Sequence, residues 1–356
     1  MRYFPKKIIL DPTMAQTPVA QRVLAQCPEA SVVRQPVLSV SPDEKEPTLY
    51  LMENPGVFFK PCPATPEYVC CNYRILNFGT GCPIQCTYCI LNGYLHSRAL
   101  THFCDHDRLF VELDKALNAE KGFVRIGSGE FTDSLVIDHL TDFSREIIPF
   151  FLKRKDVLFE IKTKTDNVEN LLQFNGKRKI LVSWSVNPQS IIDQEEKGSA
   201  SLTERLAAAK KCMESGYLIG FHFDPILRHE GWEEGYTRVV KAIYQYVDPE
   251  VIAWISLGGF RFVPELKEVI QRHYPTSRIT QEEFVRGRDG KMRYFRPLRE
   301  EMYRHIISEI RKYHPTAPLY FCMESPQVWE RMMGRTHFCS DSLAGLLNET
   351  RKRFCL

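Results

Sequence analysis

The sequence lacks a long hydrophobic run, a strong charge of either sign, an internal repeat and a low-complexity tract. No apolar stretch reaches the roughly 18 residues that a membrane-spanning helix needs, and the first residues contain no apolar core of a secretory signal. Because 47 basic and 44 acidic residues leave a net charge of only +3, overall charge indicates no partner. With 356 residues, 44% of them hydrophobic, the chain is predicted to be globular and cytoplasmic, without a membrane segment.

Cysteine is present, with 12 residues, but its distribution is uneven. A large chain without a signal peptide is expected to keep its thiols reduced. Clustered cysteines then indicate metal or redox chemistry, whereas scattered ones behave mostly as small buried hydrophobic residues. Cys82, Cys86 and Cys89 form a tight cluster, while Cys322 is expected to be a core residue.

From residue 74 onward, short β-branched or aromatic runs alternate with amphipathic stretches. Strands are predicted at 74–78, 123–127, 157–162, 180–186, 217–224 and 252–257. Helices are predicted after them at 107–120, 134–152, 165–174, 202–215, 233–247 and 263–273. Six strand–helix units in series predict an α/β fold with a parallel sheet, and six are too few to close an eight-unit barrel. We therefore expect a partial (β/α)6 barrel that binds its ligands at the C-terminal ends of the strands.

The barrel is expected to span residues 74–275, between an irregular N-terminal layer at 1–73 and a C-terminal region at 276–356 that holds a basic hairpin and a helix at 298–314. Asp289-Gly290 between two alternating runs predicts the hairpin. Residues 284–299 contain six basic side chains and one acid, interleaved with aromatic rings. This pattern favours nucleic-acid contact, although a solvated basic hairpin that resists edge pairing would look the same. The candidate contacts are Arg286, Arg288, Lys291, Arg293 and Tyr294.

The strongest signal is segment 79–89, GTGCPIQCTYC, directly after the first predicted strand. Its C-x3-C-x2-C spacing lets three thiolates surround one iron–sulfur cluster or one zinc ion. A structural zinc site normally takes four ligands, so three local cysteines favour a 4Fe-4S cluster with one iron left open. The alternatives are three unliganded cysteines, or a zinc site completed by His96, His102 or Cys104.

This motif, after the first strand of a partial barrel, resembles the radical S-adenosylmethionine superfamily. The resemblance implies that Cys82, Cys86 and Cys89 hold a 4Fe-4S cluster whose open iron binds S-adenosylmethionine. Reductive cleavage then yields a 5′-deoxyadenosyl radical, with the electron supplied by a cytoplasmic reductant such as flavodoxin or ferredoxin. The second strand ends in Gly-Ser-Gly-Glu, similar to the superfamily's Gly-Gly-Glu segment, which implies cofactor contacts for Ser128 and Glu130. A tight turn with a solvated carboxylate is the alternative there.

Other segments narrow the resemblance to the spore photoproduct lyase family, over residues 74 to about 300. HEGWEEGY at 229–236 and VIDHL at 136–140 are similar to segments of that family. The resemblance implies cofactor contacts for Lys164 and Ser185, against a solvated charge and a buried strand hydroxyl as alternatives. His229 and Glu230 follow the fifth strand and are expected on the ligand-binding rim, or else at the start of the next helix.

Two of three hydrogen-relay positions differ from that family. Spore photoproduct lyases carry a thiol in the loop after the second strand, where this chain has Glu130. They also carry a tyrosine on each side of the last cluster cysteine, and here Tyr88 is kept while Ile90 replaces the other. The resemblance therefore gives Tyr88 and Glu130 the catalytic positions, and a carboxylate cannot donate a hydrogen atom as a thiol can.

The sequence thus predicts a radical S-adenosylmethionine enzyme that acts on DNA, for example on a pyrimidine lesion. Two alternatives stay open. One keeps the radical chemistry but acts on RNA or on a small metabolite. The other is a catalytically silent nucleic-acid-binding protein with a structural cluster, which would not cleave S-adenosylmethionine.

Overall fold

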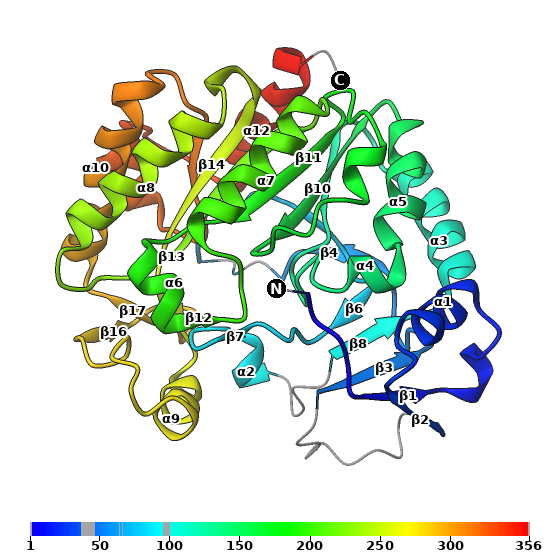
Figure 1. Cartoon of the computed structure of the whole chain (residues 1–356). Coiled ribbons are helices and arrows are strands. Elements are labelled where there is room, and N and C mark those ends of the chain that lie inside the picture. The colour runs from blue at the N-terminus through cyan, green and yellow to red at the C-terminus, as the bar shows by residue number, and fades with distance from the viewer. Residues whose placement is uncertain (1, 37–46, 64, 66, 95–99, 355–356) are drawn as a thin grey trace.

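A curled eight-stranded sheet forms the centre of the molecule in this computed structural model, which describes residues 2–36, 47–63, 65, 67–94 and 100–354 (Figure 1). The strands follow the order β18-β14-β13-β11-β10-β9-β5-β4, and all neighbours pair in parallel except β4 with β5. The strands are β4 (Phe59–Pro61), β5 (Arg74–Leu76), β9 (Val124–Gly127), β10 (Val157–Thr163), β11 (Ile180–Ser185), β13 (Leu218–Ile226), β14 (Ile252–Gly259) and β18 (Leu319–Phe321). The partial barrel is confirmed: the six predicted strands are present and adjacent in chain order.

Helices cover the outer face of this sheet (Figure 1). They are α3 (His106–Ala119), α4 (Asp138–Thr141), α5 (Phe143–Leu152), α7 (Leu202–Glu214), α8 (Trp232–Tyr246) and α10 (Arg296–Tyr313). Helix α7 begins with a reciprocal capping box: Ser201 Oγ accepts from Glu204 N at 3.3 Å, and Glu204 Oε2 accepts from Ser201 N at 2.8 Å.

Two predicted helices differ from the structure. The one at 134–152 is divided into α4 and α5 by Asp142, whose φ of 52° is left-handed. The one predicted at 165–174 is wrong, because only a 3-10 turn forms there, at Leu171–Gln173. Its polar side chains bind distant backbone instead: Asn167 Nδ2 donates to Leu135 O at 2.7 Å, and Asn170 Nδ2 donates to Asp138 O at 3.1 Å. Such side chains compete with helix formation.

The two faces of the barrel strands differ in polarity, as strand β10 illustrates. Phe159 points outward and stacks on Phe151 of α5, with ring centroids 4.2 Å apart. Alternate residues therefore point inward. Glu160 accordingly lies in the interior, where its Oε1 is 2.8 Å from His222 Nε2 on β13. The interior of the barrel is thus polar, and a ligand there would meet charged and hydrogen-bonding groups.

The N-terminal layer is present but more regular than its sequence indicates. It contains helix α1 (Pro18–Gln26) and three strands of a second sheet, whose order is β2-β1-β3-β8-β6. The strands of this sheet are β1 (Lys7–Leu10), β2 (Ser31–Arg34), β3 (Thr48–Met52), β6 (Gly79–Thr80) and β8 (Leu100–Phe103), the last two from the range predicted for the barrel. These strands have at most five residues, too few to show a clear alternation. Proline at the first position of α1, after the N-cap Thr17, marks a helix start rather than a break.

The C-terminal region contributes elements to both ends of the barrel. The predicted hairpin is β16 (Phe284–Arg286) and β17 (Met292–Tyr294), which pairs with β15 (Arg261–Phe262), and α9 (Pro264–His273) lies nearby (Figure 1). Helix α11 (Pro326–Met333) follows β18. Helix α12 (Ser340–Phe354) lies at the N-terminal ends of the strands, where Asn348 Oδ1 accepts from Arg125 at 3.0 Å. Within the described residues, no helix combines the length and apolarity needed to cross a membrane.

Candidate functional site

The cysteine loop lies at the C-terminal ends of the barrel strands, between β6 and α2 (Leu91–Tyr94) (Figure 1). Cys86, in β7 (Gln85–Cys86), pairs antiparallel with Glu196 in β12 (Glu196–Lys197), the short strand that follows α6 (Gln189–Glu195). Thr87 N donates to Glu195 O at 2.9 Å, and Cys89 N donates to Cys86 O at 3.2 Å. Contacts within the protein therefore order the second half of the loop.

The three thiols lie close enough to influence one another. Burial raises the pKa of Cys82, and the neighbouring Cys86 and Cys89 thiols raise it further. Burial also raises the pKa of Cys86, but the Lys164 ammonium opposes this effect. A cation beside the loop favours the thiolate form that binds iron. The donor set therefore fits a soft metal centre.

Among the described residues, no three His, Cys, Asp or Glu side chains gather as ligands of a single ion. Two proposed zinc ligands have other partners: His102 Nε2 is 3.1 Å from His106 Nε2, and the Cys104 thiol donates to His102 O at 3.8 Å. The third, His96, lies outside the described residues.

The loop after β9 brings Glu130 beside Lys162 of β10. A Cβ on Gly129 would approach Lys162 Cβ to 2.7 Å, so only glycine allows this contact. Burial acts to lower the pKa of Lys162, but Glu130 and then Glu160 outweigh it and the net shift is upward. Ser128 is buried, with its Oγ 2.8 Å from Ser134 Oγ, so its hydroxyl is engaged within the protein.

Lys164 lies beside the cysteine loop, whereas Ser185 is buried at the end of β11, where its carbonyl accepts from Arg205 Nη1 at 2.8 Å. The cofactor contacts expected of both residues stay predictions. Lys164 Nζ is 5.6 Å from the ring centroid of Tyr88. The sequence gives no role to Asp133, three residues after Glu130, although its carboxylate accepts from Lys164 N at 2.7 Å and influences Cys82. Burial raises the pKa of Asp133. Its place in the same loop as Glu130 is the signal that could have identified it.

A buried carboxylate, Glu196, connects the loop to the rest of the barrel. It accepts hydrogen bonds from the Tyr88 hydroxyl, from Asn187 Nδ2 at 2.9 Å and from Arg205 Nη2 at 2.5 Å. Burial acts to raise the pKa of Glu196, but Arg205 and Lys164 outweigh it and lower the value to about 2. Sequence patterns miss this residue because its partners lie on three separate segments.

His229 and Glu230 lie at the edge of the same region. The His229 ring centroid is 6.4 Å from that of Tyr236, whose hydroxyl donates to Asn187 Oδ1 at 2.9 Å. His229 Nδ1 is 2.8 Å from Glu230 O, and within the described part of the chain its buried Nε2 has no partner. Glu230 is exposed. Their place on a ligand-binding rim and their contact with a ligand stay predictions.

The hairpin presents fewer cations than its sequence indicates. Arg286 and Arg288 are exposed, and Lys291 is partly buried near Asp289. Arg293 is 2% exposed and Tyr294 is fully buried, with its hydroxyl accepting from Arg228 N at 3.1 Å. These two side chains do not reach the surface, so the nucleic-acid contacts expected of the hairpin narrow to the exposed arginines.

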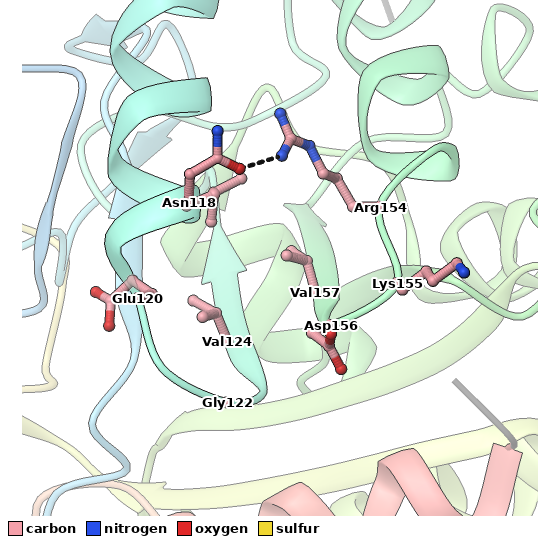
Figure 2. A pocket seen from close by; sticks show the side chains of 9 residues that line it. Asn118, Glu120, Gly122, Val124, Arg154, Lys155, Asp156 and Val157 are labelled. Atoms are coloured by element: carbon pink, nitrogen blue, oxygen red, sulfur yellow. Dashed lines mark hydrogen bonds between the residues drawn. The ribbon is translucent and has the colours of Figure 1, made fainter.

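A polar surface cavity of about 200 Å³ lies at the opposite end of the barrel, near the start of β9 and β10 (Figure 2). Asn118, Glu120 and Arg154 contribute to its lining, and Asn118 Oδ1 accepts from Arg154 Nη1 at 3.1 Å. Because parallel α/β barrels bind ligands at the C-terminal ends of their strands, this cavity is separate from the cysteine loop.

Comparison with known proteins assigns the family. The family model described as "Spore photoproduct lyase" matches residues 67–322, which include the cysteine loop, all six predicted strands and the hairpin. This chain belongs to the spore photoproduct lyase family. It is 30% identical to the spore photoproduct lyase of Bacillus subtilis over 246 residues, covering 65% of this chain and 69% of that one. With the spore photoproduct lyase of a Geobacillus species it shares 29% identity over 252 residues, covering 68% and 74%.

Solved structures of spore photoproduct lyase agree with the fold. A cysteine-to-serine mutant matches 90% of this chain and 100% of its own, with a TM-score of 0.79 and 26% identity. A double mutant with bound AdoMet and dinucleoside spore photoproduct gives the same coverage, a TM-score of 0.80 and 25% identity. Membership of the spore photoproduct lyase family makes the protein a radical S-adenosylmethionine lyase with a 4Fe-4S cluster. Cys82, Cys86 and Cys89 are the residues that fit that cluster.

Proposed function

We propose that this radical S-adenosylmethionine lyase acts on a photolesion in DNA and binds the duplex next to the lesion through its basic hairpin. The family match carries the proposal, because it includes both the cysteine loop and the hairpin. A related solved structure is described with bound dinucleoside spore photoproduct. The cofactor supplies a carbon radical that removes a hydrogen atom from the substrate, and the protein must hold the lesion within reach of it.

The residues of this chain divide into two groups around the substrate. Lys164, beside Tyr88, and Ser185, at the end of β11, are suited to the carboxylate and hydroxyl groups of S-adenosylmethionine. Glu130 and Lys162 lie together at the end of the barrel interior and would bind the amino group of the cofactor or a polar edge of the lesion. Because opposite charges neutralise each other there, the site suits a polar, uncharged base better than a phosphate.

The hairpin supports the choice of DNA. A base that reacts inside the barrel must leave the helical stack, and the protein must hold the surrounding backbone while it does so. Arg286 and Arg288 are exposed on the hairpin for that purpose, and exposed Phe295 follows β17. Exposed aromatic and cationic side chains are the kinds of group that stabilise opened nucleic acid. A cytoplasmic electron carrier such as flavodoxin or ferredoxin would reduce the cluster.

One observation favours a second candidate. In the resemblance to spore photoproduct lyases, Glu130 takes the position of the thiol that returns a hydrogen atom to the product. A radical enzyme without that thiol could act on a different substrate, such as RNA or a small metabolite, and end its reaction in another way.

Product analysis tests both candidates. The cluster is reconstituted anaerobically, a chemical reductant is added, and the protein is incubated in turn with oligonucleotides carrying spore photoproduct, a cyclobutane dimer or undamaged RNA. Mass spectrometry then measures 5′-deoxyadenosine and repaired thymine. Thymine released from one photolesion supports the proposal. Cleavage of S-adenosylmethionine without thymine favours the second candidate, and no cleavage at all would point to a silent binding protein.

A further inference from the structure

The ion pair between Glu196 and Arg205 takes no part in the proposed chemistry, yet both side chains are fully buried. Arg205 directs four hydrogen bonds to its surroundings. They go to Glu196 Oε2 at 2.5 Å, Ser199 Oγ at 2.6 Å, Ser185 O at 2.8 Å and Ala200 O at 2.9 Å. Arg205 therefore connects the end of β11 with the segment that leads into α7.

The Glu196 carboxylate makes the connection to the cysteine loop. Its backbone pairs with Cys86, and its side chain accepts from the Tyr88 hydroxyl and from Asn187 Nδ2. Asn187 Oδ1 in turn accepts from the Tyr236 hydroxyl of α8. One carboxylate thus joins the cysteine loop, the residues after β11 and, through Asn187, helix α8.

We propose that the buried Glu196–Arg205 pair is a positioning unit that fixes the cysteine loop against the end of β11. Its effect is that Cys86, Cys89 and Ser185 keep their relative positions whether or not a cluster is bound. The identity of the group that these residues hold rests on the proposed function, whereas the coupling of the two segments does not. Glu196 and Arg205 act through other residues and are positioning residues rather than catalytic ones.

The hydrogen-bonding needs of Tyr88, Glu196 and Arg205 explain why a charged pair lies between the cysteine loop and the end of β11. A buried tyrosine hydroxyl needs a hydrogen-bond partner, and a carboxylate can accept from several donors at once. A buried carboxylate in turn needs a cation with well-oriented donors, and the rigid guanidinium of arginine offers five. Removing one member leaves the others buried without a partner, so the network is expected to fail as a unit.

Hydrogen exchange in the protein without its cluster tests the coupling directly. Mass spectrometry follows the amides of residues 85–89, which are ordered by the pairing of β7 with β12. Glu196→Gln keeps the shape of the side chain but removes its charge, and Tyr88→Phe removes only the hydroxyl. Each is expected to speed exchange of these amides by about 5- to 150-fold, the factor that corresponds to one buried group left unpaired.

A double-mutant cycle separates positioning through Tyr88 from a general loss of stability. If Glu196 holds the loop through Tyr88, the combined variant exchanges no faster than the faster single variant. Asp138→Asn is the matched control: this buried carboxylate accepts from Ser144 N at 2.8 Å, on α5. In Asp138→Asn, the exchange rate of the amides of residues 85–89 is expected to equal that of the wild-type protein, with the amides of the N-terminal sheet as the internal reference.

A second variant guards against simple unfolding. If Glu196→Gln gives no native circular dichroism spectrum, Glu196→Met combined with Arg205→Met removes both charges and leaves an apolar pair of similar volume. It too is expected to speed exchange at 85–89, because Tyr88 and Asn187 still lose their acceptor. Unchanged exchange in folded Glu196 variants, or strictly additive effects with Tyr88→Phe, would overturn the proposal.

A readout on the loaded protein completes the test. Glu196→Gln is expected to bind S-adenosylmethionine more weakly at equal iron content, with a changed electron paramagnetic resonance spectrum of the reduced cluster when the cofactor is added. Hydrogen exchange requires neither cluster, cofactor nor DNA. Its outcome is therefore distinguishable from failure of the proposed function, which would appear only in the products.

Discussion

Arg293 binds Asp289 through two hydrogen bonds of 2.5 and 2.8 Å, and both residues belong to the basic hairpin. Arg293 also lies over the Tyr68 ring, with its guanidinium carbon 4.3 Å from the ring centroid. The hairpin thus uses one of its cations to hold its own turn. Only its exposed arginines can neutralise phosphates without breaking that structure.

Replacing Arg286 and Arg288 with alanine is therefore expected to weaken DNA binding and its dependence on salt. The slope of log affinity against log salt concentration should flatten by roughly 0.7–0.9 for each phosphate that is no longer neutralised. Lys153→Ala combined with Lys155→Ala removes the same charge from exposed positions near the other end of the barrel and should leave the slope unchanged. Fluorescence anisotropy titrations at several salt concentrations measure both. Equal slopes in all proteins would show that the hairpin does not bind DNA.

The cysteine loop leaves no redundancy among its ligands. Cys82→Ala, Cys86→Ala and Cys89→Ala are each expected to abolish the cluster, because each thiolate holds a different iron. Cys104→Ala and Cys339→Ala should retain it, since the first thiol is bound to His102 O and the second is exposed near the C-terminal helix. Iron and sulfide analysis after anaerobic reconstitution provides the measurement. Full iron content in any loop variant would contradict the assignment.

Glu130 distinguishes this chain from the lyases that it resembles. If Glu130 binds the amino group of the cofactor, Glu130→Gln should weaken S-adenosylmethionine binding by roughly 10- to 150-fold, the value of a charge-assisted hydrogen bond. The cluster should stay intact, because the effect acts at the Lys162 side of the site. Equilibrium dialysis with the reconstituted protein measures this affinity. Wild-type affinity would instead assign Glu130 to the substrate or to Lys162 alone.

Glu130→Cys places a thiol at this position and tests whether the protein then behaves as a spore photoproduct lyase. A lyase with a displaced hydrogen donor should change its product pattern only modestly. A protein with another native reaction should lose that turnover and gain weak reversal of the photoproduct. Product analysis by mass spectrometry separates the two outcomes.

Acid is expected to destabilise the protein through its buried carboxylates. Burial acts to raise the pKa of Glu160, but His222 and Lys162 lower it from 4.5 to about 2. Between these values the unfolded chain binds more protons than the native one, so stability falls as the pH drops through this range. The contribution of Glu160 is of the order of 3 kcal/mol at neutral pH.

Urea unfolding at pH 6 and at pH 3 measures this effect. Glu160→Gln should lose less unfolding free energy between pH 6 and pH 3 than the wild-type protein does. Part of the loss should remain in this variant, because Glu196 also has a pKa of about 2. Glu349→Gln changes an exposed carboxylate and serves as the control. An unaltered pH dependence in Glu160→Gln would contradict the assigned role of His222.

Segments with strong local signals were predictable from sequence. The six barrel strands follow short β-branched or aromatic runs, and α7 adds a capping box of Ser201 and Glu204 to its periodic apolar face. The cysteine spacing likewise located the centre of the site. The helix expected at 165–174 was not predictable, because Asn167 and Asn170 bind backbone far away in the chain. Neither was Glu196, whose importance depends on partners that only the folded chain brings together.

Residues 74–80 connect the two sheets of the molecule. Strand β5 belongs to the barrel, while β6, three residues later, pairs with β8 of the N-terminal sheet, and the cysteine loop follows directly. A shortened protein starting at residue 67 would retain the entire region that matches the family. It would nevertheless lose β1, β2 and β3, and with them the support behind β8 and β6. The limits of sequence similarity therefore cut through a sheet of this protein, and we expect the N-terminal layer to support the cysteine loop rather than to be a removable module.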